Sequence, residues 1–148
     1  MIEERIQKDL VEAMKSHQEV ATSAIRFLKT EIQNEKVKGT YHELTDEEII
    51  KVVQKLVKQR QESMEIYLQA GRTELAETEK GEMEVLMQYL PKQLSEEEIT
   101  ENVKKIIAAL GATSIKDMGK VMGIANKQMA GVASGQVISK IVKTILSQ

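Results

Sequence analysis

The chain has 148 residues, which is enough for one domain or for two small ones. Charged residues make up 30% and aromatic residues 3%, and there is a single proline, so the composition favours a globular helical protein. The absence of cysteine excludes disulfides, thiol nucleophiles and cysteine-ligated zinc or iron–sulfur centres. The net charge of −2 hides an asymmetry, because residues 1–94 carry 14 basic and 18 acidic side chains (−4) whereas residues 95–148 carry 7 and 5 (+2).

The N-terminal segment and the hydropathy pattern indicate where the protein works. Residues 1–10 mix charged and apolar side chains and lack the apolar core of a secretory signal peptide. No run of about 18 apolar residues is present, so no membrane-spanning helix is expected. Together with the missing cysteines, these features predict a cytoplasmic protein that does not act in a membrane.

Apolar residues recur at helical spacing through the first half of the chain. One stripe runs from Ile2 to Met14 and a second from Val20 to Val37, after which Gly39 opens a loop. Thr45 and Glu48 form the Thr-x-x-Glu pattern of a capping box, which predicts that a third helix begins there.

The third helix is expected to end at Gly71, in the manner of a glycine C-cap, and a fourth to run from about Thr73 to Tyr89. These two helices would form a long hairpin. Pro91 disfavours helical backbone in the residue before it, so the fourth helix should end near Tyr89. Because the charge balance also changes there, we predict an N-terminal domain of residues 1–92 and a C-terminal domain of residues 93–148.

Three shorter helices are expected after this boundary. Ser95 and Glu98 form a second capping box, which predicts a helix that ends near Leu110. Ser114 is in position to cap the next helix, and a glycine-containing break at residues 131–135 would precede the last one. No strand pattern competes with these helices. The predicted fold is therefore all-α, with about four N-terminal helices followed by a small three-helix domain.

Residues suited to catalysis or metal binding are scarce. His17 has no acidic or histidine partner at the i, i+4 spacing of a metal-binding helix, and His42, which has Asp46 four residues on, lies in an expected loop and not on a helix. The paired glutamates lie at expected helix starts or on polar faces, where they favour the helix dipole or pair with lysines. No phosphate-binding loop or nucleophile elbow is present. We therefore expect no catalytic residue, no metal site and no cofactor.

Glycine is concentrated near the C-terminus, where five of the eight glycines lie between residues 111 and 135. Gly119 and Gly123 should share one helix face, and each costs about 1 kcal/mol of helix propensity relative to alanine. Two interpretations of this pair remain open: another part of the chain packs closely against it, or a ligand approaches it. Gly131 and Gly135 fit a turn, with Ser134 helping to cap the last helix.

Several segments together resemble the GatB/YqeY family of small bacterial proteins. They are "AIRFLKTEIQNEKV", "KQRQESMEIYLQAGRTELAETE", "YLPKQLSEEEI", "DMGKVMG" and "SGQVISKIV", in this order over essentially the whole chain. The resemblance implies an all-helical protein whose C-terminal part is similar to the tail of the B subunit of glutamine-dependent tRNA amidotransferase. In that setting the tail is taken to engage the elbow region of tRNA and does not perform amide transfer.

The function favoured by the resemblance and the residues is non-catalytic binding of tRNA or another structured RNA by the C-terminal domain. The candidate contacts are Lys116, Gly119, Lys120, Gly123, Lys127, Gly131, Gly135, Lys140 and Lys143. One alternative is a protein-interaction module that docks an aminoacyl-tRNA synthetase or an amidotransferase subunit. Another is carbon–nitrogen ligase activity with glutamine as amido donor, for which the chain lacks a cysteine nucleophile and Ser-Lys machinery.

The chain departs from the family pattern at one place. Where the family typically has Lys-Gly-Lys-Ala-Asp/Asn-Gly, residues 130–135 read Ala-Gly-Val-Ala-Ser-Gly. The glycines are kept, but the lysines expected at Ala130 and Val132 are absent. Losing two potential phosphate contacts would weaken an electrostatic association with RNA and flatten its salt dependence.

Overall fold

The computed structural model describes all residues from Met1 to Gln148 and consists of helices and connecting segments without a β-strand. The seven α-helices are α1 (Ile2–Lys15), α2 (Glu19–Lys36), α3 (Asp46–Gln69), α4 (Thr73–Met87), α5 (Glu96–Leu110), α6 (Met118–Gln128) and α7 (Gly135–Leu146). The predicted all-α class, with four helices followed by three, is confirmed.

The chain divides into two compact units, Met1–Leu90 and Pro91–Gln148. Unit 1 contains α1 to α4 and unit 2 contains α5 to α7. Whether these units are domains that fold on their own, as a division after residue 92 supposes, stays a prediction.

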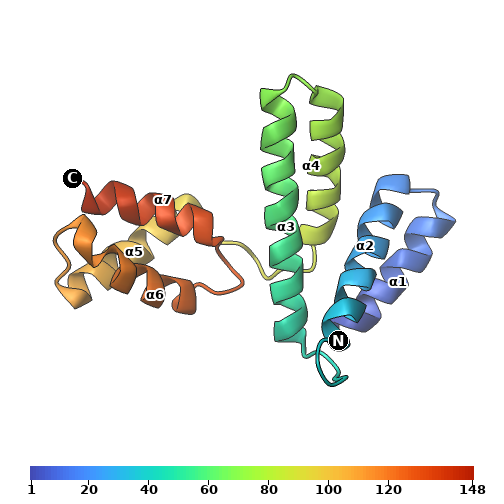
Figure 1. Cartoon of the computed structure of the whole chain (residues 1–148), viewed down its shortest axis with the longest axis horizontal. Helices are drawn as coiled ribbons and strands as arrows, with labels where there is room; N and C mark the ends of the chain where they lie inside the picture. The colour runs from blue at the N-terminus through green and yellow to red at the C-terminus, as the bar shows by residue number, and fades with distance from the viewer. The chain divides into compact units, whose positions relative to one another are not determined.

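Unit 1 is built from two helical hairpins, α1–α2 and α3–α4, and α2 packs against α4 (Figure 1). The predicted capping box opens α3: the Thr45 hydroxyl accepts from the Glu48 backbone N–H at 3.2 Å, and the Glu48 carboxylate accepts from the Thr45 backbone N–H at 3.2 Å. The turn between α3 and α4 contains Gly71 at φ +74°, a left-handed conformation that favours glycine. The long hairpin predicted from the sequence is therefore present.

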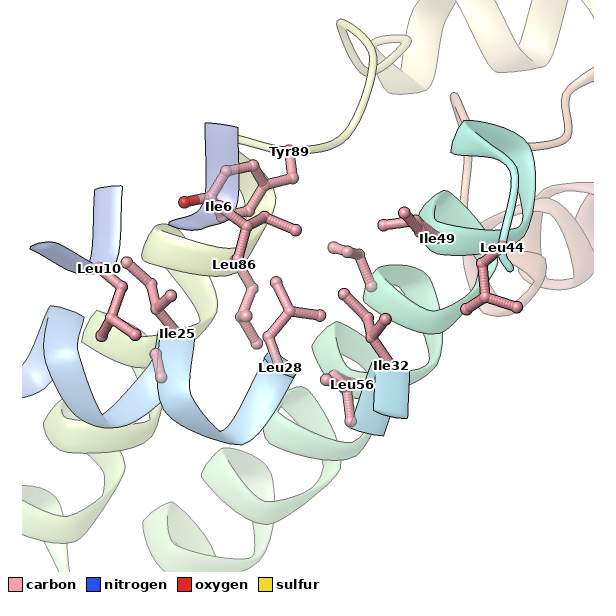
Figure 2. Packing of buried hydrophobic residues seen from close by; sticks show 12 residues of the cluster. Ile6, Leu10, Ile25, Leu28, Ile32, Leu44, Ile49, Leu56, Leu86 and Tyr89 are labelled. Atoms are coloured by element: carbon pink, nitrogen blue, oxygen red, sulfur yellow. The ribbon is translucent and has the colours of Figure 1, made fainter. Parts of the chain in front are cut away.

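The core of unit 1 draws apolar side chains from all four helices, and Figure 2 shows them converging. Ile6 of α1, Leu28 of α2 and Leu86 of α4 are each almost completely buried. Burying a side chain of this size contributes roughly 1.5–3 kcal/mol to folding. The predicted apolar stripes extend too far at their ends, because Met14, Val20 and Val37 are all exposed.

Unit 2 is a three-helix unit with its own core, to which α5, α6 and α7 all contribute. The capping box predicted at Ser95 is confirmed, with the Ser95 hydroxyl accepting from the Glu98 backbone N–H at 3.1 Å. The cap predicted at Ser114 is wrong, because that side chain makes no capping hydrogen bond. A short 3-10 turn (η1, Ile115–Asp117) intervenes instead, and the Asp117 carboxylate accepts from the Thr113 backbone N–H at 3.1 Å.

Candidate RNA-binding surface

The glycine pair of α6 lies on the outward face of that helix. Val121 and Ala125 are fully buried in the core of unit 2, and they fix which side of α6 faces inward. Gly119 and Gly123 are exposed, and a Cβ atom added at either position would have no neighbouring atom within 4 Å. The interpretation that this pair allows close packing within the chain is therefore wrong, and the alternative, approach by a ligand, stays a prediction.

Three lysines accompany this glycine face. Lys120 and Lys127 are exposed on α6, and Lys116 is exposed in η1 immediately before it. Residues seven apart in a helix differ in direction by only about 20°, so Lys120 and Lys127 project from the same flank, with Gly123 between them along the axis. The outward face of α6 thus presents positive charge next to two positions that carry no side chain.

The remaining two candidate lysines come from a different helix. Lys140 and Lys143 are exposed on α7, on the side opposite the buried residues Ile138 and Val142. The five lysines therefore form two groups, three along η1 and α6 and two along α7.

The second glycine pair has a structural explanation that the sequence only partly revealed. Gly131 is buried at φ +81°, and its carbonyl accepts from the Gln93 side-chain amide at 2.9 Å. Gly135 is exposed and begins α7, which the Ser134 hydroxyl caps by accepting from the Val137 backbone N–H at 3.2 Å. The predicted break and the predicted Ser134 cap are confirmed. Burial of Gly131 indicates that it shapes the loop, and contact with RNA at this residue stays a prediction.

Sequence reasoning missed the segment that holds this loop in place. Besides the Gln93 contact, the Leu94 backbone N–H donates to the Val132 carbonyl at 2.8 Å. These bonds join positions almost forty residues apart in the chain, so no local pattern could have revealed them. They tie the segment before α5 to the loop before α7 and fix where α7 begins.

The two positions where the chain departs from the family pattern differ in environment. Ala130 is exposed just after α6, whereas Val132 is partly buried and packs against the core of unit 2. A lysine at position 130 would reach solvent without disturbing the fold, but a lysine at position 132 would replace an apolar core contact.

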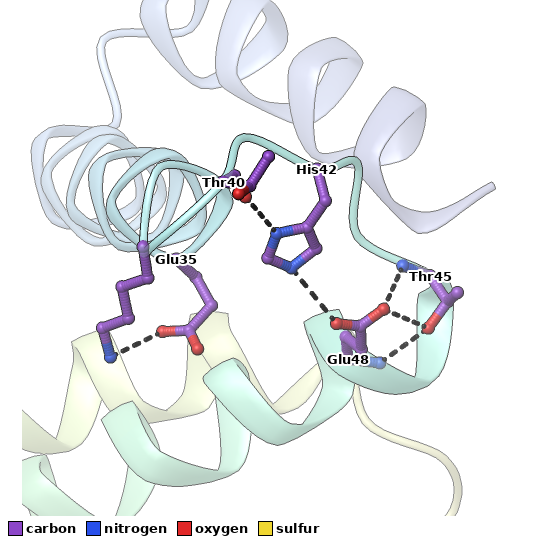
Figure 3. A network of polar contacts seen from close by, with 6 residues as sticks. Glu35, Thr40, His42, Thr45 and Glu48 are labelled. Carbon is purple, nitrogen blue, oxygen red and sulfur yellow. Dashed lines mark hydrogen bonds and ion pairs between the residues drawn. The ribbon is translucent and has the colours of Figure 1, made fainter.

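The two histidines lie in different surroundings. His42 donates from Nδ1 to the Thr40 carbonyl at 3.2 Å, and its Nε2 lies 3.7 Å from a Glu48 carboxylate oxygen (Figure 3). The same carboxylate completes the capping box of α3. His17 follows α1 in a left-handed conformation at φ +55°. No group of three or more acidic, histidine or cysteine side chains is close enough to hold a metal ion. None of the seven α-helices could span a lipid bilayer.

Comparison with known proteins finds a family match over almost the whole chain. The family model described as Yqey-like protein matches residues 3–146. Altered inheritance of mitochondria protein 41 of Pyrenophora tritici-repentis is 31% identical over 146 residues, covering 96% of this chain and 79% of that protein. The protein of the same name from Saccharomyces cerevisiae is 32% identical over 105 residues, covering 69% of this chain and 56% of that protein. An uncharacterized protein of Schizosaccharomyces pombe is 32% identical over 90 residues, which are 61% of this chain and 72% of that protein.

Proposed function

The chain belongs to the Yqey-like protein family, and from the surface of α6 we propose that it is a non-catalytic protein that binds tRNA or another structured RNA through residues 93–148. The observation that carries this proposal is the exposed position of Gly119 and Gly123. Glycine inside a helix costs about 1 kcal/mol relative to alanine, and here no packing within the chain offsets that cost. Close approach of a ligand backbone would offset it.

Lysines at the edge of this bare surface favour a polyanionic ligand. A phosphate backbone could lie against the glycine face while Lys116, Lys120 and Lys127 neutralise its charge. The exposed lysines of α7, Lys140 and Lys143, would provide a second row of contacts. Because unit 2 has no aromatic residue, base stacking cannot contribute there, and recognition of backbone and shape is the mode that its chemistry supports.

The proposal includes the absence of catalysis and a cytoplasmic location. Carbon–nitrogen ligase activity with glutamine as amido donor would need a nucleophile, and the chain has no cysteine. A glutaminase assay that detects turnover by the purified protein would contradict the non-catalytic proposal.

A second candidate function, docking to an aminoacyl-tRNA synthetase or an amidotransferase subunit, is favoured by a different observation. Near the α3–α4 turn, Ile66 is 65% exposed, and Leu68 and Leu75 are also exposed. Exposed apolar side chains of this size are common at protein-binding surfaces. In this alternative, substitutions on α6 would leave the interaction unchanged, whereas Leu68→Ser would weaken it.

The test of RNA binding is fluorescence anisotropy with tRNA across a salt series. Lys120→Glu and Lys127→Glu should each weaken binding and lower the slope of log K against log salt by about 0.7–0.9 or more, because at least one phosphate contact is lost. Lys55→Glu, at an exposed lysine of unit 1, makes the same charge change and should leave the slope unaltered. If tRNA binds no better than unstructured RNA of equal length, or if the α6 variants bind as the wild type does, the proposal is wrong.

A gain of charge tests the same surface in the opposite direction. Ala130→Lys restores a lysine at an exposed position, so it should raise the affinity for tRNA and steepen the salt dependence by about 0.7–0.9. Unchanged affinity would show that the phosphate backbone does not pass near the loop at residues 130–135.

A further inference from the structure

The only phenylalanine of the chain lies at the surface of unit 1 beside an arginine. Phe27 projects from α2 and is 41% exposed. The Arg60 guanidinium of α3 lies over the Phe27 ring, with its central carbon 4.9 Å from the ring centroid. One face of the ring is therefore covered by a cation, and the exposed area belongs to the rest of the ring.

Two carboxylates lie beside this arginine. Its Nε lies 3.0 Å from a Glu82 carboxylate oxygen and its Nη1 lies 3.7 Å from a Glu79 carboxylate oxygen, both on α4. The Arg60 side chain is only 15% exposed, and each glutamate is similarly buried. The stack thus draws on α2, α3 and α4, and the two carboxylates compensate the arginine charge as ion pairs, while the Arg60 Nε and a Glu79 carboxylate oxygen make no hydrogen bond.

A shallow surface cavity, open to solvent, runs along α2 next to this stack. Its volume is about 730 Å³. Phe27 and Arg26 lie in the middle of the α2 wall, and the hydroxyls of Ser23 and Thr30 lie about one helical turn to either side. Met14 and His17 contribute from the end of α1 and the residues that follow it.

We propose that this cavity binds one unpaired nucleobase of an RNA by stacking on Phe27. Planar bases stack on aromatic side chains, and such stacking tolerates any base. Arg26 can contact the adjoining phosphate, and the hydroxyls of Ser23 and Thr30 can hydrogen-bond to the sugar. In taking RNA as the ligand, this inference rests on the proposed function.

The charge of unit 1 limits how much RNA the site can take. Residues 1–90, which form unit 1, carry 13 basic and 18 acidic side chains, a net charge of −5. Glu19 adds a carboxylate to the cavity lining, and the charge of Arg60 is compensated by Glu79 and Glu82. A duplex, which would bring many phosphates to this surface, is therefore disfavoured, whereas a single extruded nucleotide brings one. Binding at this site should accordingly depend on the base and only weakly on salt.

The experiment uses the full chain and labelled single-stranded hexanucleotides. Hexaadenylate should bind about 10-fold more tightly than a hexamer of abasic ribose phosphate, since each stacked base contributes substantially to affinity. Phe27→Leu keeps an apolar side chain and should abolish this preference, whereas Phe27→Tyr should retain it. Tyr41→Leu removes another exposed aromatic ring and serves as the matched control, which should leave the preference unchanged.

Two outcomes would overturn the inference: the abasic hexamer binds as tightly as hexaadenylate, or Phe27→Leu keeps the wild-type preference while its thermal unfolding shows a folded protein. The failure of this inference can be told apart from the failure of RNA binding by unit 2. Lys120→Glu should lower tRNA affinity but leave the preference for hexaadenylate intact. If tRNA binding is unaffected by Lys120→Glu while the Phe27-dependent preference is observed, the base site stands and the α6 surface does not.

Discussion

Replacing Gly123 with alanine tests whether the glycine face of α6 serves the fold or a ligand. Gly123 is the sixth of eleven residues in α6, so it lies in the interior of the helix, where alanine exceeds glycine in propensity by about 1 kcal/mol. A Cβ atom at this position meets no atom within 4 Å. Gly123→Ala should therefore stabilise the protein by about 1 kcal/mol while adding one methyl group to the proposed RNA surface.

A glycine in another helix provides the matched comparison. Gly81 lies within α4, but a Cβ atom there would approach the Val20 Cγ1 atom to 3.3 Å, closer than most such contacts. The gain in helix propensity at Gly81 should be offset by this crowding, because α2 must shift or Val20 must change its rotamer. Gly81→Ala should therefore stabilise less than Gly123→Ala does, or destabilise.

The assay combines thermal or urea unfolding, followed by circular dichroism, with tRNA anisotropy on the same samples. A gain of 1 kcal/mol corresponds to a rise in melting temperature of about 2–8 °C for domains in this size range. The proposed function predicts that Gly123→Ala is more stable and binds tRNA more weakly. A Gly123→Ala variant that is less stable would refute the reasoning on packing. A variant that is more stable with unaltered affinity would show that no backbone approaches this face.

Three further predictions concern stability. Lys36 is buried and donates hydrogen bonds to the carboxylates of Glu3 and Glu43, which raise its pKa from 10.5 to about 12. The stabilisation is therefore complete below pH 10.5 and is lost as the pH rises through about 12, so the urea midpoint of Lys36→Met should lie below that of the wild type at pH 8, with the gap closing at high pH. Tyr89→Phe removes a 2.6 Å hydrogen bond from the hydroxyl to the partly exposed Asp9 carboxylate and should cost about 1 kcal/mol, measured by urea unfolding. Ser134→Ala removes the cap of α7 and should cost about 1 kcal/mol in a thermal melt.

Much of the fold follows from local signals in the sequence. Both capping boxes, at Thr45 and Ser95, start helices where the pattern predicts, because a capping box satisfies its hydrogen bonds within four residues. Ser114 fails as a cap because the backbone first makes a 3-10 turn, and the Asp117 carboxylate binds the Thr113 N–H instead. The residue types near Ser114 permitted both arrangements, so the sequence alone did not distinguish them.

The candidate site was less predictable because it depends on which side of a helix is covered. The spacing of Gly119 and Gly123 places both on one face, but the sequence left open whether that face is inside or outside. Only the burial of Val121 and Ala125 identifies it as the outside. The Phe27–Arg60 stack was not predicted, because its two residues lie on different helices and no local spacing relates them.

The departure from the family pattern at residues 130–135 is a second case in which the sequence does not reveal which residues are buried. In the sequence, the missing lysines at Ala130 and Val132 count equally as lost positive charge. In the structure, Ala130 is exposed and Val132 packs against the core. Alanine in place of lysine at position 130 therefore only removes positive charge, whereas valine at position 132 also gains an apolar contact. Valine at position 132 adds apolar burial to a loop that the Gly131–Gln93 and Val132–Leu94 hydrogen bonds already hold. Valine at position 132 therefore serves the packing of this loop, whereas a lysine could be restored at position 130, next to the proposed phosphate contacts of η1, α6 and α7.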